Sequence, residues 1–138
     1  MPPGSPWPRG DAVKKQVIEH KSKAKYWPRA VVAGDQIYVA TSGIGEDGQA
    51  VGPTFEEQFD FTLNEVKETL ESLGSSIDDI VEMTIYFLDM KEDNDKVGPI
   101  WAKYFKVMPM VAGIGTSQLL PMDPPLRVEV TLTAIIPS

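Results

Sequence analysis

The segment 126–136 (LRVEVTLTAII) has the strict alternation of apolar and polar residues that is typical of a β-strand. The apolar positions are Val128, Val130, Leu132, Ala134 and Ile136. The positions between them are polar: Arg127, Glu129, Thr131 and Thr133. Because successive side chains of a strand point to opposite faces of its sheet, we expect the apolar face to pack under helices. The polar face then remains for solvent, a ligand or another chain.

The other elements predict an α/β subunit of the α+β kind, a mixed sheet with two helices on one face. Gly34-Asp35 is a hairpin turn signal, and residues 54–73 carry an apolar stripe at helical spacing. Gly74 follows that helix as a C′ residue. The expected strands are 13–20, 29–33, 36–41, 80–88, 110–119 and 126–136, and the expected helices are 54–73 and 95–105. In strand 80–88, one face is expected to hold Val81, Met83, Ile85 and Phe87.

Composition limits the chemistry. The chain has 138 residues, no cysteine, one histidine and a formal net charge of −7. This length fits a single domain over 13–138, which a flexible proline-rich arm at 1–12 would precede. Without cysteine there is no disulfide, thiolate zinc site or cysteine nucleophile, and with His20 as the one histidine any metal centre would need almost entirely oxygen ligands. The acidic charge argues against nucleic acid as a partner.

The sequence also makes predictions about location and assembly. We see no targeting segment and no apolar run long enough to span a membrane, so a cytoplasmic protein with no membrane partner is expected. Two helices cover only one face of a five- or six-stranded sheet. Tyr38, Leu88 and Ile135 make the opposite face too apolar to leave entirely to water, which predicts burial against further copies of the chain.

Several segments together resemble the RidA/YjgF family of reactive-intermediate deaminases. They are GDQIYVA (34–40), LNEVKETLESLGSSIDDIV (63–81), TIYFLDM (84–90), WAKYF (101–105) and LPMDPPLRVEVTLTAI (120–135). The resemblance covers about residues 30–136. It implies a chorismate-mutase-like subunit and a homotrimer with ligand clefts between subunits. It also implies hydrolysis of enamines or imines such as 2-aminoacrylate, or of aminomuconate-type compounds, without a metal or cofactor.

At the site, the resemblance applies to some residues and fails at others. Glu129 lies where the family places the carboxylate that positions a water. The family's Pro-Ala-Arg motif corresponds to PMVAG, with Val111 at the position of the arginine that binds a substrate carboxylate, and Gly113 where cysteine is common. A valine cannot form the charge-assisted fork that arginine offers. The sequence therefore predicts a divergent member with a less polar pocket.

Other residues are candidates for binding. Trp27 and Tyr38 are candidates for stacking on a conjugated ligand, with packing as the alternative. Arg127 is a candidate substitute cation, although an ion-pair role is favoured, and the backbone amides around Val111 and Gly113 are candidates for an oxygen of the ligand. For Glu129, catalysis and an interface hydrogen bond both fit.

The leading functional hypothesis is a hydrolytic deaminase in which Glu129 holds the water. The alternative is a non-catalytic trimer that binds a small ligand, which the missing arginine favours. A ribonuclease or translational inhibitor is the third possibility, and the charge of −7 disfavours it.

Overall fold

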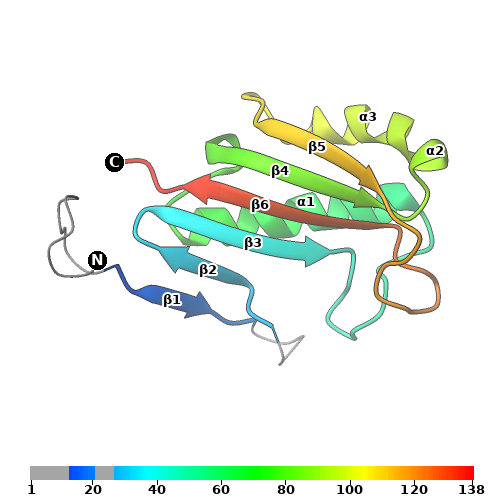
Figure 1. The fold of residues 1–138 in the computed structure, drawn as a ribbon, viewed down its shortest axis with the longest axis horizontal. Coiled ribbons are helices and arrows are strands. Elements are labelled where there is room, and N and C mark those ends of the chain that lie inside the picture. Colours follow the sequence, from blue (N-terminus) through cyan, green and yellow to red (C-terminus); the bar gives the residue numbers. More distant parts are fainter. Residues whose placement is uncertain (1–12, 21–26) are drawn as a thin grey trace, which may run out of the picture.

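The computed structural model describes residues 13–20 and 27–138, so the predicted arm at 1–12 lies outside the described residues. Within this part of the chain, six strands form one sheet in the order β1-β2-β3-β6-β4-β5. Figure 1 shows the helices on one face of this sheet, with α1 lying behind the central strands. The strands are β1 (Lys15–Ile18), β2 (Ala30–Ala33), β3 (Gln36–Ser42), β4 (Ile80–Phe87), β5 (Met110–Gly115) and β6 (Val128–Ile135). The predicted α+β architecture is thereby confirmed.

Strand pairing follows the local signals. β2 and β3 form the predicted hairpin, and Gly34 adopts a φ of 63°, a left-handed conformation that glycine tolerates at no steric cost. β6 lies between β3 and β4 and is antiparallel to each of them. β5 is parallel to β4 at one end of the strand order. A parallel neighbour requires a crossover, which the helical segment after β4 supplies.

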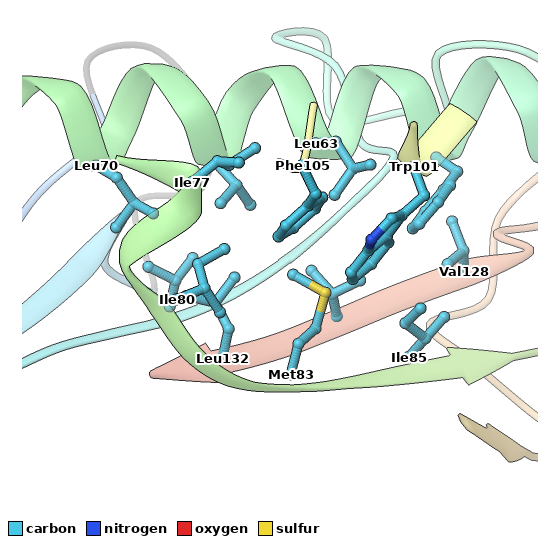
Figure 2. Close-up of a cluster of buried hydrophobic side chains, with 14 of the residues drawn as sticks. Leu63, Leu70, Ile77, Ile80, Met83, Ile85, Trp101, Phe105, Val128 and Leu132 are labelled. Atoms are coloured by element: carbon cyan, nitrogen blue, oxygen red, sulfur yellow. The ribbon is translucent and has the colours of Figure 1, made fainter. Parts of the chain in front are cut away.

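Helix α1 (Phe55–Ser72) covers the apolar face of the sheet. Its N-cap is Thr54, whose hydroxyl accepts from the Glu57 backbone N–H at 3.1 Å and donates to the Glu57 carboxylate at 2.8 Å. Gly74, with a φ of 80°, follows the helix end as predicted. Figure 2 shows the resulting core, in which side chains from α1, β4, β6 and the second helical segment meet. Its labelled members include Leu63, Leu70, Met83, Ile85, Trp101, Phe105, Val128 and Leu132, all of them buried.

The predicted alternation of β4 is wrong at its beginning. The pairing of β4 with β6 shifts register between Ile80 and Glu82, so Val81 is an extra residue in the strand. This bulge leaves Ile80 buried and Val81 51% exposed, whereas Met83, Ile85 and Phe87 are buried as predicted. A bulge changes which face a side chain occupies, and a simple period of two cannot anticipate it.

The second predicted helix, 95–105, starts earlier and ends earlier in the structure. It consists of α2 (Met90–Asp93), a 3-10 turn η2 (Asn94–Lys96) and α3 (Val97–Trp101). The Asp89 carboxylate caps α2 by accepting from the Glu92 backbone N–H at 3.2 Å. Pro99 falls in the first turn of α3, where its missing N–H costs no helical hydrogen bond. A further 3-10 turn, η1 (Ile77–Asp79), precedes β4.

The opposite face of the sheet has no helix over it in the described residues. Tyr38 and Ile135 are among its exposed apolar side chains. Among the described helices, none is long and apolar enough to cross a membrane.

Candidate functional site

A cavity of about 620 Å³ lies on the helix-free face of the sheet, over β3 and β6. Its walls come from the segment before β2, from the outward-facing residues of the central strands, and from the loops after β3 and β5. They include Trp27, Pro28, Val31, Tyr38, Ala40, Ser42, Ile44, Glu82, Leu120, Glu129, Thr131 and Thr133. This volume suits a small organic ligand. We call this cavity the open-face pocket.

Glu129 lies at one end of the open-face pocket. It is paired across the sheet with Ser42 of β3 on one side and with Tyr86 of β4 on the other. Burial raises the pKa of the Glu129 carboxyl above its ordinary value, because the partly dry surroundings disfavour the charged form. A carboxylate in such surroundings is a stronger base than an exposed one, which suits it to accept a proton from water.

The other end of the pocket holds a second carboxylate, Glu82. The Thr133 hydroxyl donates a hydrogen bond of 2.8 Å to a carboxylate oxygen of Glu82. Thr133 is also the cross-strand partner of Tyr38, whose ring completes this end. The Tyr38 hydroxyl donates in turn to the Gln36 side chain. A carboxylate, a hydroxyl and an aromatic ring therefore meet at the end farthest from Glu129.

Trp27 forms part of the wall beside β2 and is 48% exposed. The structure thus brings together three of the residues singled out from the sequence, namely Trp27, Tyr38 and Glu129. Sequence reasoning missed Ser42 and Glu82. Their signal is alternation combined with strand order, because it is the placement of β6 between β3 and β4 that brings these side chains to one face.

Gln58 holds the two loops that border the pocket. Its side chain is fully buried beneath them, where its amide nitrogen donates to the carbonyl oxygens of Gly52 (2.9 Å) and Pro125 (3.0 Å). Its amide oxygen accepts from the backbone N–H of Arg127 at 2.7 Å. Gly43 packs directly against this side chain, since a Cβ at residue 43 would lie 2.6 Å from the Gln58 Cβ. One residue of α1 therefore sets the position of both loops.

Arg127 is placed away from the open-face pocket, with its guanidinium turned to α2. Its Nε and Nη2 lie 2.9 Å and 2.8 Å from the same carboxylate oxygen of Asp93, which is fully buried. The Lys96 ammonium contacts the other oxygen of Asp93 at 3.1 Å. Each oxygen of this buried carboxylate thus has a cationic partner, as a buried charge requires. Within the chain, Arg127 acts as an ion-pair residue.

Val111 and Gly113 also lie outside the walls of the pocket, on β5. Their register partners are Met83 and Ile85, so their side-chain positions share the face that the helices cover. Val111 is 40% exposed, and a Cβ at residue 113 would lie 3.4 Å from the Met90 methyl group. The backbone of this strand forms one edge of the described sheet.

The described residues contain no group of three or more His, Cys, Asp or Glu side chains placed to hold a metal ion. The functional groups of the open-face pocket are carboxylates, hydroxyls and aromatic rings. Such groups can orient water, accept protons and stack on a flat ligand.

Comparison with known proteins gives a consistent result. Residues 18–136 match the family described as Endoribonuclease L-PSP. A RutC family protein from Saccharolobus solfataricus is 30% identical over 127 residues, which cover 88% of this chain and 98% of that protein.

Solved structures share the fold. The Rid family protein YyfA from Yersinia pestis is 26% identical with a TM-score of 0.78, covering 88% of this chain and 99% of that chain. A YjgF/YER057c/UK114 family member from Mycobacterium tuberculosis has a TM-score of 0.73 at 24% identity, with coverage of 88% and 99%. The predicted chorismate-mutase-like fold is thereby confirmed. The chain belongs to the RidA/YjgF family, whose members are also described as endoribonuclease L-PSP and RutC proteins.

Proposed function

We propose that the protein is a hydrolytic deaminase of the RidA type. It acts on a small enamine, imine or aminomuconate-type compound and releases ammonia. The observation that carries this proposal is the placement of Glu129, a partly buried carboxylate of raised pKa at one end of a pocket of about 620 Å³. The family is linked to this chemistry. The resemblance noted from the sequence implies that Glu129 is its water-positioning carboxylate, which supports the proposal.

The proposed reaction needs a single base and no cofactor. An enamine first tautomerises to its imine. Glu129 then accepts a proton from a water molecule while the water oxygen bonds to the carbon of the imine, protonated from solvent, whose nitrogen becomes an amine. Glu129 returns its proton to this nitrogen so that it can leave, and the hydroxyl proton passes to solvent. When the resulting carbinolamine collapses, the C–N bond breaks, ammonia leaves and a carbonyl group remains. The sum is one imine and one water giving one carbonyl compound and one ammonia.

The aromatic residues in the pocket walls support the proposal that the ligand is flat and conjugated. Trp27 precedes β2 and Tyr38 lies on β3, and both are partly exposed residues that line the pocket. Offset stacking of a conjugated ligand on such rings contributes on the order of 1 kcal/mol beyond the burial of area. We infer that these two side chains orient the reacting carbon toward Glu129.

The proposal includes a homotrimer with ligand clefts between subunits. Two features support assembly. The helix-free face exposes large apolar side chains, among them Tyr38 and Ile135, and β5 leaves one strand edge open in the described sheet. Exposed apolar surface and open strand edges commonly mark an interface with another chain. Closed symmetry is the usual way in which copies of one chain cover such surfaces.

The alternative is a trimer that binds a small molecule without turning it over. It is favoured by Val111, which stands at the position of the motif arginine and offers no cation to a substrate carboxylate. E. coli TdcF, a relative in fold at 17% identity and a TM-score of 0.75, is known with bound serine. The same pocket could then serve as a sensor of a metabolite.

Ammonia release from freshly generated 2-aminoacrylate and from an aminomuconate-type imine tests the proposal. We expect the wild-type protein to accelerate release and Glu129→Gln to lose at least 100-fold in rate, in line with removal of a general base. Light scattering must show the same oligomer for each protein. The non-catalytic alternative is supported, and the deaminase proposal is rejected, if the wild type releases no ammonia above background while thermal-shift screening finds ligands.

A ribonuclease assay on single-stranded RNA should be negative, because an acidic protein repels the phosphate backbone.

A further inference from the structure

A second cavity, of about 230 Å³, lies on the helix-covered side of the sheet. It is bordered by the C-terminal half of α1, by η1 and by the residues that follow α3. Its walls include Lys67, Glu71, Ile77, Asp78, Lys103 and Tyr104. We call it the helix-side cavity. The assembly proposed above buries the opposite face of the sheet, so this cavity is separate from the open-face pocket and from that interface.

Two walls of the helix-side cavity are held in place by hydrogen bonds. One oxygen of the Asp78 carboxylate accepts from the backbone N–H groups of Val107 (3.0 Å) and Lys106 (2.8 Å). These bonds hold the pKa of Asp78 below its ordinary value, so the group is charged at neutral pH. Its other oxygen remains free to accept from a ligand. The Tyr104 ring is fixed because its hydroxyl donates to the Asp60 carboxylate at 2.9 Å.

The rim on α1 carries two charges that are not used within the described part of the chain. Lys67 and Glu71 are one helical turn apart, yet they form no ion pair with each other or with another described residue. The cation precedes the anion, which is the less favourable order for a direct pair on a helix. The second cation, Lys103, lies 3.7 Å from the Asp60 carboxylate in an exposed ion pair, and such pairs contribute little.

The charges around the helix-side cavity alternate in sign and cancel. Among the described residues that line it, the charged side chains are two cations and two carboxylates: Lys67, Lys103, Glu71 and Asp78. A ligand of a single charge is attracted by one pair and repelled by the other. A ligand that carries both charges can place each of them beside its opposite.

The size and the floor of the cavity limit the ligand further. A volume of about 230 Å³ is the share of about eight water molecules at ~30 Å³ each, which suits a small metabolite rather than a peptide. Ile77 is 5% exposed, and with the fixed Tyr104 ring it provides apolar surface beside the charges.

We propose that the helix-side cavity binds a free α-amino acid with an apolar side chain. The carboxylate of the amino acid pairs with Lys67, and its ammonium donates to the free oxygen of Asp78. Its side chain packs on Ile77 and Tyr104, while Glu71 and Lys103 complete the alternation of charge around it. This site lies outside the deaminase machinery proposed above and does not depend on it.

Three compounds test this inference: L-leucine, N-acetyl-L-leucine, which lacks the ammonium, and L-leucine methyl ester, which lacks the carboxylate. Each is titrated into the isotope-labelled full-length protein, and its dissociation constant is taken from the shifts of backbone amide signals in NMR spectra. The titrations are repeated on Lys67→Gln and on Asp78→Asn, which keeps an oxygen for the two backbone N–H groups. Lys91→Gln is the matched control for Lys67→Gln, since Lys91 is an exposed lysine of α2 outside the cavity.

We expect L-leucine to bind roughly tenfold more tightly than either derivative, because each derivative loses one charge-assisted contact. Lys67→Gln should weaken L-leucine about fivefold or more and leave the methyl ester nearly unchanged, since the ester has no carboxylate to lose. Asp78→Asn should weaken L-leucine and leave the N-acetyl compound nearly unchanged. Lys91→Gln should change no constant, and the largest shifts should lie around Ile77 and Tyr104.

Several results would overturn the inference. They are equal affinities for the three compounds, equal losses of L-leucine affinity in Lys67→Gln and Lys91→Gln, and shifts that centre on Tyr38 and Thr131 of the open-face pocket. The absence of any saturable shift up to the solubility limit of L-leucine would also reject it. Ammonia release from an imine is a separate measurement, so the failure of the deaminase proposal and the failure of this site are distinguishable.

Discussion

The backbone N–H of Arg127 donates a 2.7 Å hydrogen bond to the side-chain oxygen of Gln58, which lies fully buried in α1. This contact joins the residue that precedes β6 to the helix on the other side of the sheet. Through the same side chain, α1 also holds the carbonyls of Gly52 and Pro125. The side-chain amide of Gln58 thus holds both loops that border the open-face pocket.

Replacement of Gln58 by alanine should destabilise the fold by about 2–4 kcal/mol, because three hydrogen bonds are lost and buried backbone groups are left without partners. Urea denaturation followed by circular dichroism measures this change. Asn64→Ala on the exposed face of the same helix is the control and should cost less than about 1 kcal/mol. Equal losses for the two variants would show that the Gln58 amide has no special part in holding the loops.

Arg127 and Asp93 should be strongly coupled in stability. Their contact is buried on the Asp93 side, so removal of one partner leaves a charge without compensation. A double-mutant cycle with Asp93→Asn and Arg127→Gln should give a coupling energy of about 2 kcal/mol. A coupling energy near zero, together with a large effect of Arg127→Gln on ligand affinity, would instead support the substrate-binding role predicted from the sequence.

The pKa of Tyr104 should lie well above that of an ordinary tyrosine. Burial, together with the hydrogen bond that its hydroxyl donates to the Asp60 carboxylate at 2.9 Å, raises the pKa of Tyr104 to about 12. An ordinary tyrosine has a pKa of about 10. Ultraviolet difference absorbance should therefore show an ionisation phase about two pH units above the ordinary tyrosine value, and Tyr104→Phe should remove that phase.

The same shift has a consequence for stability. Between about pH 10 and 12 the unfolded chain loses the Tyr104 proton and the folded chain keeps it, so this stabilising contribution falls as pH rises. Wild type should lose stability in this range faster than Tyr104→Phe. Parallel curves for the two proteins would contradict the assignment.

Glu129 should make the protein less stable as its carboxyl ionises. Its folded-state pKa is raised by burial, so the folded chain binds its proton more tightly than the unfolded chain does. The stabilising contribution is complete below the ordinary value of about 4.5 and is lost as pH rises through the folded-state pKa. Relative to wild type, Glu129→Gln should therefore gain stability as the pH rises above about 4.5. A difference that stays constant over this range would show that burial does not perturb Glu129.

Much of the fold could be predicted from the sequence, because local signals and tertiary packing agree. The alternation of β6, the apolar stripe of α1 and the Gly34 turn each appear in the structure as expected. The bulge at Val81 could not be predicted, since it arises from the pairing of β4 with β6 rather than from the residues themselves. The early start of the second helical segment at Met90 depends on the Asp89 cap, which lies before the apolar stripe of residues 95–105.

Some residues of the candidate site could likewise be predicted from the sequence, and others could not. Glu129 and Tyr38 could be found because each lies on an outward-facing position of a recognisable strand. Ser42 and Glu82 required knowledge of which strands are neighbours, and Arg127 required knowledge of the buried carboxylate at Asp93. Contacts between residues that are far apart along the chain produce no periodic pattern in a single sequence.

The pH dependence of ammonia release, measured for wild type and Glu129→Gln on the same imine, is the most direct test of the central claim. The account predicts that the wild-type rate rises with pH through an apparent pKa above the ordinary glutamate value of 4.5, as the Glu129 carboxylate forms. Glu129→Gln should remain near background at every pH while keeping the wild-type oligomer. Full turnover by Glu129→Gln, with an unchanged pH profile, would contradict it.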